Sequence, residues 1–491
     1  MIAVTGPPDE LNTYWQLLIL LATLAVALTA SGHAILWKRD SRSALIWVSL
    51  IWFLPLLGPV LYSIFGINRI KRRAALLRSD RTTIDSRPTV RPCQPASIAA
   101  RLDSSSPGTD LCAIATTISK ITNRSLLPGN RIELLKNGDE AFPSMLSAIT
   151  EAKTTITLSC YIFDLDPIGA RFAHELANAM KRGVDIRVLI DSTGARYSWP
   201  PITERLEQLR IPYARFFSSM KLIRPLTLNL HNHRKIMVVD GKIGFTGGMN
   251  IRHSNQLKAK PKRPVQDLHF RLRGPVVAHL QAAFAEDWAY ATSQRLSGEA
   301  WFPKLRSQGK ILARGITDGP DEDLDKLIWT IIASLNAATS SVWIVTPYFL
   351  PEAQIIAALN AAAMRGVSVH ILLPKKNNLP FMNWASSAML WQVVQQGCKV
   401  YQTPPPFDHT KVMVVDDCWA LIGSANWDAR SLRLNFEFNV ECYSQSLAVA
   451  LREHIESKLT DTRQITIEEL DGRPLPIKLR DGLTRLLSPF L

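Results

Sequence analysis

Two stretches of the chain repeat a histidine and a lysine two residues apart. The first reads HRKIMVVDGKIGFTGGMN from His233, and the second reads HTKVMVVDDCWALIGSAN from His409. Side chains at positions i and i+2 of a strand share one face, so each stretch presents an imidazole beside an ammonium group. The candidate site residues are His233, Lys235, Asp240 and Asn250 in the first stretch and His409, Lys411, Asp416 and Asn426 in the second.

This residue set suits phosphoryl transfer. If the two stretches meet, one histidine can attack phosphorus while the other protonates the departing alcohol, and the lysines and asparagines neutralise the phosphate oxygens. An imidazole pKa near 6.5 allows both roles at neutral pH. The lysines supply the positive charge, and no Asp/Glu/His set near the stretches has metal-ligand spacing. We therefore expect no metal and no cofactor.

The elements around these stretches also occur twice. An amphipathic helix at 141–152 leads into the apolar strand TTITLSCYIFD, and a helix at 324–338 leads into SSVWIVTPYFLP. In each half a second helix then ends at a glycine, Gly183 or Gly366, where a C-cap glycine is expected. Helices that alternate with apolar strands predict an α/β sheet in each half. A duplicated domain predicts one site at a pseudo-twofold interface.

Composition narrows the class of protein. The chain has 491 residues, 47% of them hydrophobic, which excludes wholesale disorder, and its net charge of +15 favours anionic partners. The six cysteines form no CxxC pair and no zinc spacing, so we expect reduced thiols. Those at 160, 418 and 442 fall in strand-like runs and are expected to be core residues.

The N-terminal region predicts membrane insertion. Tyr14–Trp37 and Ala44–Phe65 are uncharged stretches of 24 and 22 residues, each long enough as a helix to cross about 30 Å of hydrocarbon. Pro55 and Pro59 leave a kinked or half-inserted second segment open. Five basic residues follow the second segment and three lie between the two. This bias predicts a multi-pass protein with its body on the cytoplasmic side.

These patterns predict four regions. Residues 1–73 form the membrane region, and 74–110, rich in Arg, Ser, Thr and Pro, form a linker. Residues 111–300 form the first half with one His-Lys stretch, and 301–491 form the second half with the other.

The arrangement resembles the phospholipase D superfamily, whose duplicated HKD motif both stretches reproduce. Within that superfamily it is similar to the bacterial cardiolipin synthases, through LPLLGPVLYSIFG, PKKNNLPFMNWAS, SANWDARSLRLNFEFN and the C-terminal RLLSPFL. The resemblance implies an α/β fold of two tandem phospholipase D-type domains forming a pseudo-twofold pair, preceded by two transmembrane helices. It also implies a bacterial inner-membrane enzyme that condenses two phosphatidylglycerols and releases glycerol.

The resemblance also implies residue roles. His233 would be the nucleophile and His409 the acid and then the base, although the near symmetry leaves the reverse open. Asp267 and Glu437 would orient the imidazoles, whereas Asp240 and Asp416, although within the motif, are more often structural in this family.

Competing functions share the same chemistry. A hydrolytic phospholipase D would use water as the acceptor, and a nuclease of this fold would suit the positive charge but has no need of membrane segments. Intact motifs argue against an inactive membrane scaffold. Anionic phospholipid and the membrane are the expected partners, and no nucleic acid is expected. The sequence leaves open the oligomeric state and whether the second donor is phosphatidylglycerol or phosphatidylethanolamine.

Several other features have two interpretations each. His231, two residues before His233, suits a supporting or surface role. The basic run Lys258–Pro264 suits a solvated loop or contact with anionic headgroups. Phe381, Met382 and Trp384 suit core packing or a rim for acyl chains. The C-terminal LRDGLTRLLSPFL suits packing on the body or lying on a membrane.

Overall fold

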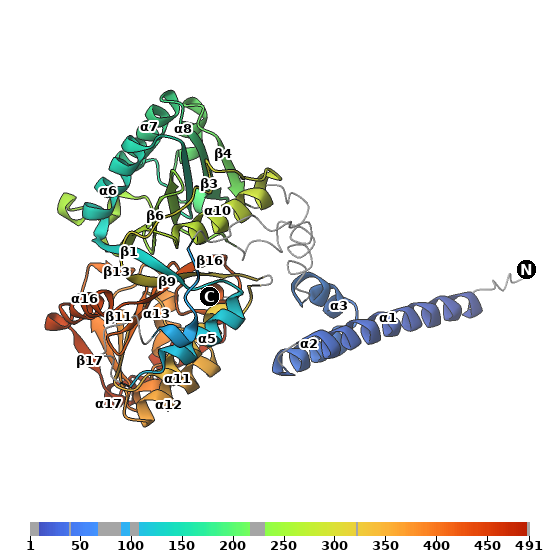
Figure 1. Ribbon diagram of the computed structural model, residues 1–491. Coiled ribbons are helices and arrows are strands. Elements are labelled where there is room, and N and C mark those ends of the chain that lie inside the picture. The colour runs from blue at the N-terminus through green and yellow to red at the C-terminus, as the bar shows by residue number, and fades with distance from the viewer. Residues whose placement is uncertain are drawn as a thin grey trace, which may run out of the picture. The chain divides into compact units, whose positions relative to one another are not determined.

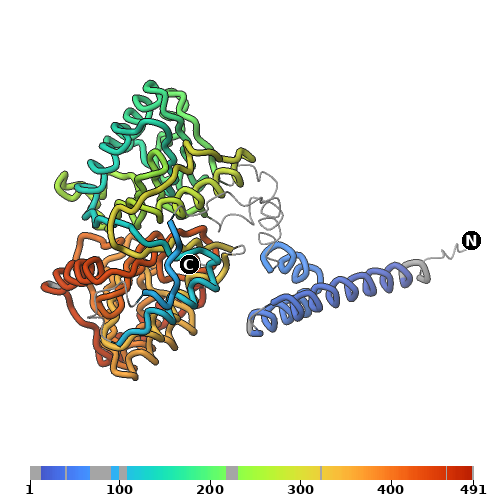
Figure 2. The backbone as a smooth tube through the Cα atoms, viewed as in Figure 1, coloured from blue at the N-terminus to red at the C-terminus, as the bar shows by residue number. Residues whose placement is uncertain are grey.

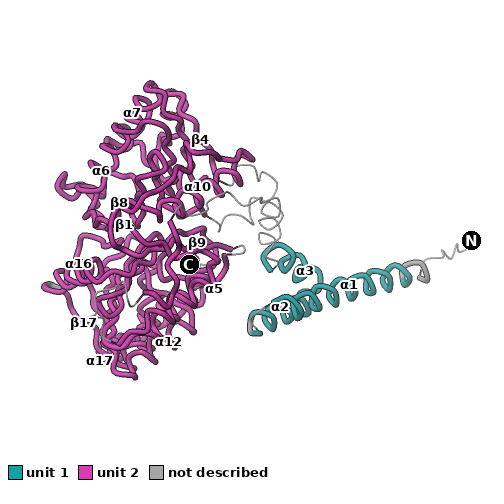
Figure 3. Tube along the Cα trace, viewed as in Figure 1, with its two compact units in different colours: residues 1–76, 223–226 teal, residues 77–222, 227–491 magenta. Residues whose placement is uncertain are grey.

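The computed structural model describes residues 9–38, 41–66, 90–98, 108–216, 231–320 and 323–488. Within them the chain divides into two compact units, one with the N-terminal helices and one with the remaining elements, the body (Figure 3). Most of the predicted linker and of the basic segment that follows the second apolar stretch lies outside the described residues.

The N-terminal unit contains one long apolar helix, α1 (Asp9–Trp37). Its segment Thr13–Trp37 is the one helix in the described part of the chain with the length and hydropathy to cross a membrane. The His33 imidazole is 2.8 Å from the Tyr62 hydroxyl, a contact that joins α1 to the later part of the unit.

The prediction of a second membrane-spanning helix is wrong, because no single helix in the described residues of the second apolar stretch is long enough to cross a membrane. The structure divides that stretch into α2 (Ser41–Phe53), α3 (Leu57–Leu61) and the π-helical turn η1 (Tyr62–Gly66). The break surrounds Pro55, which has no N–H to continue the helix and which disfavours helical backbone at the preceding residue. The 13 residues of α2 rise only about 20 Å.

The body contains the two predicted halves, each an α/β unit (Figure 1). The elements of the first half are β1 (Leu127–Lys136), α6 (Asn137–Glu151), β2 (Thr155–Cys160), α7 (Pro167–Lys181), β3 (Asp185–Asp191), α8 (Ile202–Gln208), β4 (Tyr213–Phe216), β5 (Ile236–Val239), β6 (Ile243–Gly247), β7 (Val265–Gln266), β8 (Leu268–Arg273) and α10 (Val277–Thr292). Those of the second half are β9 (Ile311–Asp318), α11 (Lys326–Ala337), β10 (Ser341–Val345), α12 (Ala353–Met364), β11 (Ser368–Pro374), α13 (Pro380–Ser387), α14 (Trp391–Val394), β12 (Lys399–Thr403), β13 (Phe407–Asp408), β14 (Val412–Val415), β15 (Trp419–Gly423), α15 (Ala429–Arg433), β16 (Glu437–Tyr443), α16 (Gln445–Glu456), β17 (Arg463–Ile465), α17 (Ile467–Asp471) and α18 (Leu475–Arg485).

The strand order reproduces the sequence repeat. Within the described residues fifteen strands form one sheet in the order β17-β12-β11-β10-β14-β15-β16-β9-β1-β8-β6-β5-β2-β3-β4. Reading outward from the central β9–β1 pair, the two halves list equivalent strands in the same order. The duplicated α/β prediction is therefore confirmed, and Gly183 and Gly366 have the positive φ values, 91° and 93°, expected after a helix end.

Three large cores hold the body together. One lies under α6, α7 and α8 of the first half, and one lies under α11 and α12 of the second. The third packs α10 and α16 against β5, β8, β14 and β16, so both halves contribute to it. This shared core fixes one half on the other and sets the geometry of residues at their boundary.

Helix α5 (Leu111–Thr122) packs on the second half although it precedes the first in sequence. Leu111, Ile114 and Ile118 are buried in the core that contains α11, and Figure 2 shows this blue segment lying among the orange elements of the second half. Cys93 and Ile98, from the part of the predicted linker that is described, are buried in the same core. The predicted domain boundaries stay a prediction.

Candidate active site

The two HKD histidines lie at equivalent places, just before β5 and β14. His233, Lys235 and Lys411 are buried with less than a tenth of their surface exposed, and the His409 side chain is 13% exposed. The strand that follows each motif is buried at all four positions, because it lies between helices on both faces. The sheet therefore holds the polar pair at the end of a rigid apolar strand.

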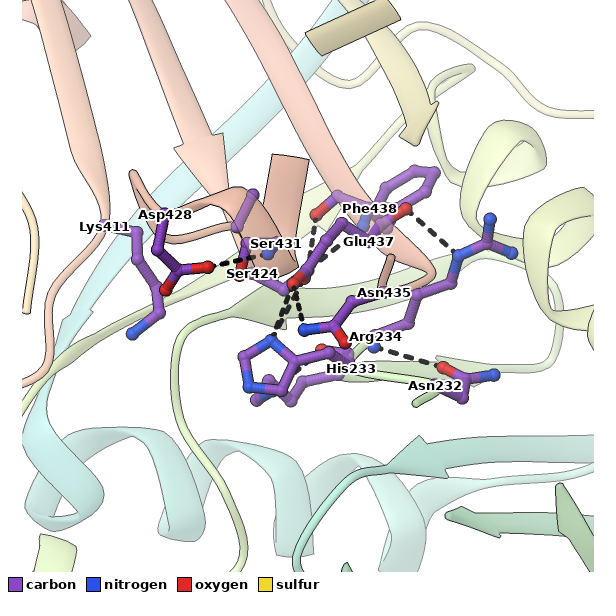
Figure 4. A network of polar contacts seen from close by, with 12 residues as sticks. Asn232, His233, Arg234, Lys411, Ser424, Asp428, Ser431, Asn435, Glu437 and Phe438 are labelled. Atoms are coloured by element: carbon purple, nitrogen blue, oxygen red, sulfur yellow. Dashed lines mark hydrogen bonds and ion pairs between the residues drawn. The ribbon is translucent and has the colours of Figure 1, made fainter. Parts of the chain in front are cut away.

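Each histidine is bound by a carboxylate of the opposite half. His233 Nδ1 lies 2.9 Å from Glu437 Oε1, and His409 Nδ1 lies 2.9 Å from Asp267 Oδ2. Figure 4 shows the His233 ring turned toward Glu437, which also accepts hydrogen bonds from Ser424 Oγ and Asn435 Nδ2. These contacts leave Nε2 of each imidazole available for chemistry.

Backbone hydrogen bonds between the two halves position these histidine–carboxylate pairs. The His233 N–H donates to the Phe436 carbonyl at 2.9 Å, and the His409 N–H donates to the Gln266 carbonyl at 2.8 Å. β7 pairs with β13 in parallel, and Asn232 bridges to Phe436 in the same sense. Each histidine is therefore held beside the residue that precedes its carboxylate partner.

The lysines lie on the same side as their histidines, as the spacing predicted. Lys235 Nζ donates to the His233 carbonyl at 2.7 Å, and Lys411 Nζ donates to the His409 carbonyl at 2.5 Å. Burial lowers the pKa of Lys235 to about 8 and that of Lys411 to about 7. A bound phosphate anion would stabilise both ammonium groups and raise these pKa values again.

The two histidine–carboxylate pairs differ electrostatically. Burial lowers the pKa of His233 to about 4, which keeps its imidazole neutral at neutral pH. Burial tends to raise the pKa of Glu437, but His233, Lys235 and the Ser424 hydroxyl outweigh it and lower that pKa overall. Burial raises the pKa of Asp267 to about 7 and lowers the pKa of His409 well below its usual value. Both imidazoles are thus neutral near pH 7, and the pairs differ in their carboxyl groups: Glu437 is firmly ionised, whereas Asp267 is partly protonated.

One residue difference between the motifs contributes to this asymmetry. Ser424 donates its hydroxyl to Glu437, while the equivalent residue of the first motif is Gly248. A Cβ at Gly248 would lie 2.6 Å from Asp267 Oδ1, so a serine does not fit there without a shift. The difference between residues 248 and 424 is visible in the sequence. Its effect on the site depends on which carboxylate each residue contacts, and only the structure shows this.

Asp240 and Asp416 lie at the far ends of β5 and β14 from the histidines. Asp240 accepts hydrogen bonds from the backbone N–H groups of 153, 154 and 155, and Asp416 accepts from those of 339, 340 and 341. Asp240 thus joins the turn before β2 to the end of β5, and Asp416 joins the turn before β10 to the end of β14. The structure brings Lys235 and Lys411 to the histidines but not these two carboxylates.

The asparagines of the two motifs make hydrogen bonds to residues that follow the strands and loops around the site. Asn250 Oδ1 accepts from the Ile162 N–H at 3.1 Å, and Asn426 donates to Asp428. Tyr161, which the sequence did not single out, lies with its ring 5.0 Å from the His233 ring and 5.4 Å from Lys235 Nζ. The sequence could have indicated Tyr161, because this residue directly follows β2 and therefore lies at the same sheet edge as the motif.

The remaining candidate residues have other surroundings. His231 is buried with Nδ1 3.6 Å from Asp191, and the run from Lys258 is largely exposed. Met382 is a core residue, whereas Phe381 is 38% exposed and Trp384 lies beneath Arg480. Cys160, Cys418 and Cys442 are buried, as expected. Among the residues that the structure describes, no group of three His, Cys, Asp or Glu side chains has the arrangement of a metal site.

Asp416→Ala is expected to destabilise the fold by about 3 kcal/mol, because three backbone N–H groups lose their acceptor. Asp417→Ala is the matched control, since both residues have positive φ, 48° and 53°, and Asp417 makes only a surface pair with Arg452. Thermal unfolding of the full-length chain in detergent measures both. Equal shifts in Tm would contradict a structural role for Asp416.

Comparisons with known proteins identify relatives of this chain. The family profile described as "Cardiolipin synthase, PLD-like domain" matches residues 145–288 and 331–459, and "Phospholipase_D-nuclease N-terminal" matches 20–66. Cardiolipin synthase A of Pseudomonas aeruginosa is 32% identical over 502 residues, covering 100% of both chains. The major cardiolipin synthase ClsA of Bacillus subtilis is 31% identical over 460 residues, covering 92% of this chain and 95% of that one. The crystal structure of phosphatidylserine synthase from Haemophilus influenzae shares the fold with a TM-score of 0.59 at 15% identity, covering 77% of this chain and 100% of that one.

Proposed function

The chain belongs to the cardiolipin synthase family of the phospholipase D superfamily, and on that premise we propose that it converts two phosphatidylglycerols into cardiolipin and glycerol. The observation that carries the proposal is the pair of largely buried histidines, each held by a carboxylate of the opposite half with two lysines beside them. That set is complete for a two-step phosphatidyl transfer.

In the first step His233 is the nucleophile. Its neutral Nε2 attacks the phosphorus of one phosphatidylglycerol, the bond from phosphorus to the glycerol oxygen breaks, and His409 gives that oxygen a proton. The product is a phosphatidyl group on His233 and free glycerol. Lys235 and Lys411 stabilise the charge on the non-bridging oxygens.

In the second step His409 reverses its role. It takes the proton from the glycerol hydroxyl of a second phosphatidylglycerol, whose oxygen attacks phosphorus while the bond to His233 breaks. Cardiolipin leaves and both imidazoles return to their starting state. One phosphodiester replaces another, so glycerol concentration influences the direction of the reaction.

The electrostatic asymmetry supports this assignment of roles. The ionised Glu437 accepts the Nδ1–H of His233 and keeps its Nε2 lone pair directed outward, as a nucleophile requires. Asp267, with its pKa near 7, can donate a carboxyl proton to His409 Nδ1, which leaves the N–H of the neutral imidazole on Nε2, where a general acid requires it. Asp240 and Asp416 act in this proposal as positioning residues that fix the motif strands.

The N-terminal unit anchors the enzyme in a bacterial inner membrane through α1. Asp9 and Glu10 begin α1, before its apolar segment Thr13–Trp37, and Lys38, Arg39 and Arg42 follow the helix. The positive-inside tendency therefore puts the C-terminal end of α1 on the cytoplasmic side. The broken segment from α2 to η1 would then enter the interface or the membrane without crossing, and the body would lie in the cytoplasm.

Purified full-length protein supplied with phosphatidylglycerol alone tests the function. Cardiolipin and glycerol in equal amounts are expected. Phosphatidic acid as the main product would instead indicate hydrolysis, the second candidate, which uses the same first step with water as the acceptor. Cardiolipin formed only after phosphatidylethanolamine is added would identify a different donor.

Activity is expected to persist in excess EDTA, because Lys235 and Lys411 supply the positive charge that a divalent ion would otherwise supply. The same vesicle assay with and without chelator measures it, and a Lys411→Met variant should lose activity in both conditions. Complete loss in EDTA, restored by one specific divalent ion, would contradict the metal-free mechanism.

A further inference from the structure

Helix α18 presents its apolar side chains to solvent. Leu475, Leu479, Leu483 and Leu486 follow one another at intervals of four, four and three residues, so they lie on one side of the helix. They are between 58% and 69% exposed. We name these four leucines the α18 face.

The opposite side of α18 carries Asp481 and Thr484 together with Ile477, and it packs on the body through the buried Asp481. Asp481 is 2% exposed, and its carboxylate accepts from Arg473 at 2.8 Å and from Arg480 at 2.7 Å. A helix on a soluble body normally turns its apolar side inward and its charges outward. Here the orientation is reversed, which indicates that the outer side meets an apolar medium.

Basic residues flank the α18 face on both sides. At about 100° per residue, Lys478 and Arg485 fall on one side of the leucine row, and Arg480, which is also paired with Asp481, falls on the other. A row of leucines edged by cations is the pattern of a helix that lies at the surface of an anionic bilayer. Phosphate groups would meet the cations while the leucines reach the acyl chains.

Contacts beneath α18 lead toward the catalytic histidines. The Arg480 guanidinium lies 4.4 Å from the centre of the Trp384 ring in α13. On the other side of α13, Met382 and Ala385 pack with Tyr348, whose ring is 6.5 Å from that of His409. The α18 face is therefore joined to the second half of the site through a single intervening helix.

We propose that the α18 face docks on an anionic phospholipid bilayer and holds the second half of the body at the lipid surface. This contact is separate from the α1 anchor. Held there, the site receives lipids from the bilayer without their passage through water. This proposal depends on the proposed function only for the identity of the lipid that the enzyme consumes.

Fluorescence depth measurements on the full-length chain test the proposal. In a Cys112→Ser background, which removes the exposed cysteine, Leu483→Cys is labelled with the fluorophore NBD and reconstituted in phosphatidylglycerol vesicles. Nitroxide on the acyl chains should quench about half of its emission, because the α18 face enters the acyl region. The control is Met364→Cys, 67% exposed at the end of α12, which should instead be quenched by aqueous iodide.

Two results would overturn the proposal. One is iodide quenching at 483 equal to that at 364. The other is disulfide cross-linking between copies through Leu483→Cys without lipid quenching, which would assign the face to a second copy of the chain. Because the readout needs no turnover, loss of cardiolipin formation would count against the proposed function alone.

An activity comparison gives a second readout of the same surface. Leu479→Ser/Leu483→Ser should lower turnover on phosphatidylglycerol vesicles by about tenfold and leave turnover on short-chain, monomeric phosphatidylglycerol unchanged. Met364→Ser should change neither. Equal loss on both substrate forms, or no loss on vesicles, contradicts docking through the α18 face.

Discussion

A phosphatidyl group covalently bound to His233 is the expected product when the His409→Ala enzyme meets phosphatidylglycerol. His409 acts in both steps, but attack by the neutral His233 Nε2 needs no base, whereas the second step lacks the imidazole that activates the incoming alcohol. His233→Ala should lower turnover by roughly 10⁴-fold or more and should trap nothing. Acid-quenched digestion and mass spectrometry at high pH identify the modified peptide.

A matched control separates this result from general damage. His174 is an exposed histidine on α7, so His174→Ala should turn over normally and carry no phosphate. A phosphatidyl group found on His409 in the His233→Ala enzyme would reverse the assignment. Phosphate on neither histidine, with activity intact in both variants, would remove the covalent mechanism.

Glu437→Gln is expected to slow formation of the covalent intermediate by about 10³-fold, since the amide no longer fixes the His233 tautomer as a carboxylate does. Its hydrogen bond to His233 spans the two halves, so a change in the second half should disable the nucleophile of the first. Asp267→Asn should instead affect the steps that depend on His409. Single-turnover quenching with labelled phosphatidylglycerol resolves glycerol release from cardiolipin formation.

Ser424→Ala provides the graded comparison. It removes one hydrogen bond to Glu437 and leaves the carboxylate, so about a tenfold loss in the first step is expected. If Glu437→Gln releases glycerol at the normal rate while Asp267→Asn does not, the roles of the two histidines are exchanged. Equal effects of both substitutions on both steps would contradict the asymmetry.

Local patterns in the sequence predicted much of this protein. The His-x-Lys spacing put each lysine beside its histidine because strand side chains alternate with a period of two, and Lys235 and Lys411 lie there. The duplicated helix–strand order predicted two α/β halves, which the strand order confirms. Asp267 and Glu437 came from the resemblance to a family, because nothing in their own spacing marks them.

Tertiary structure alone decided which groups meet. Glu437 contacts His233 and Asp267 contacts His409 only because the shared core fixes one half on the other. Residues about 200 and 140 positions apart have no spacing that a local period could reveal. Likewise, α18 reads as an ordinary amphipathic helix in the sequence. The buried ion pairs of Asp481 turn its leucines outward, and that orientation depends on the side chains that α18 packs against. Sequence periodicity thus defines the faces of an element, while packing between distant elements determines what each face touches.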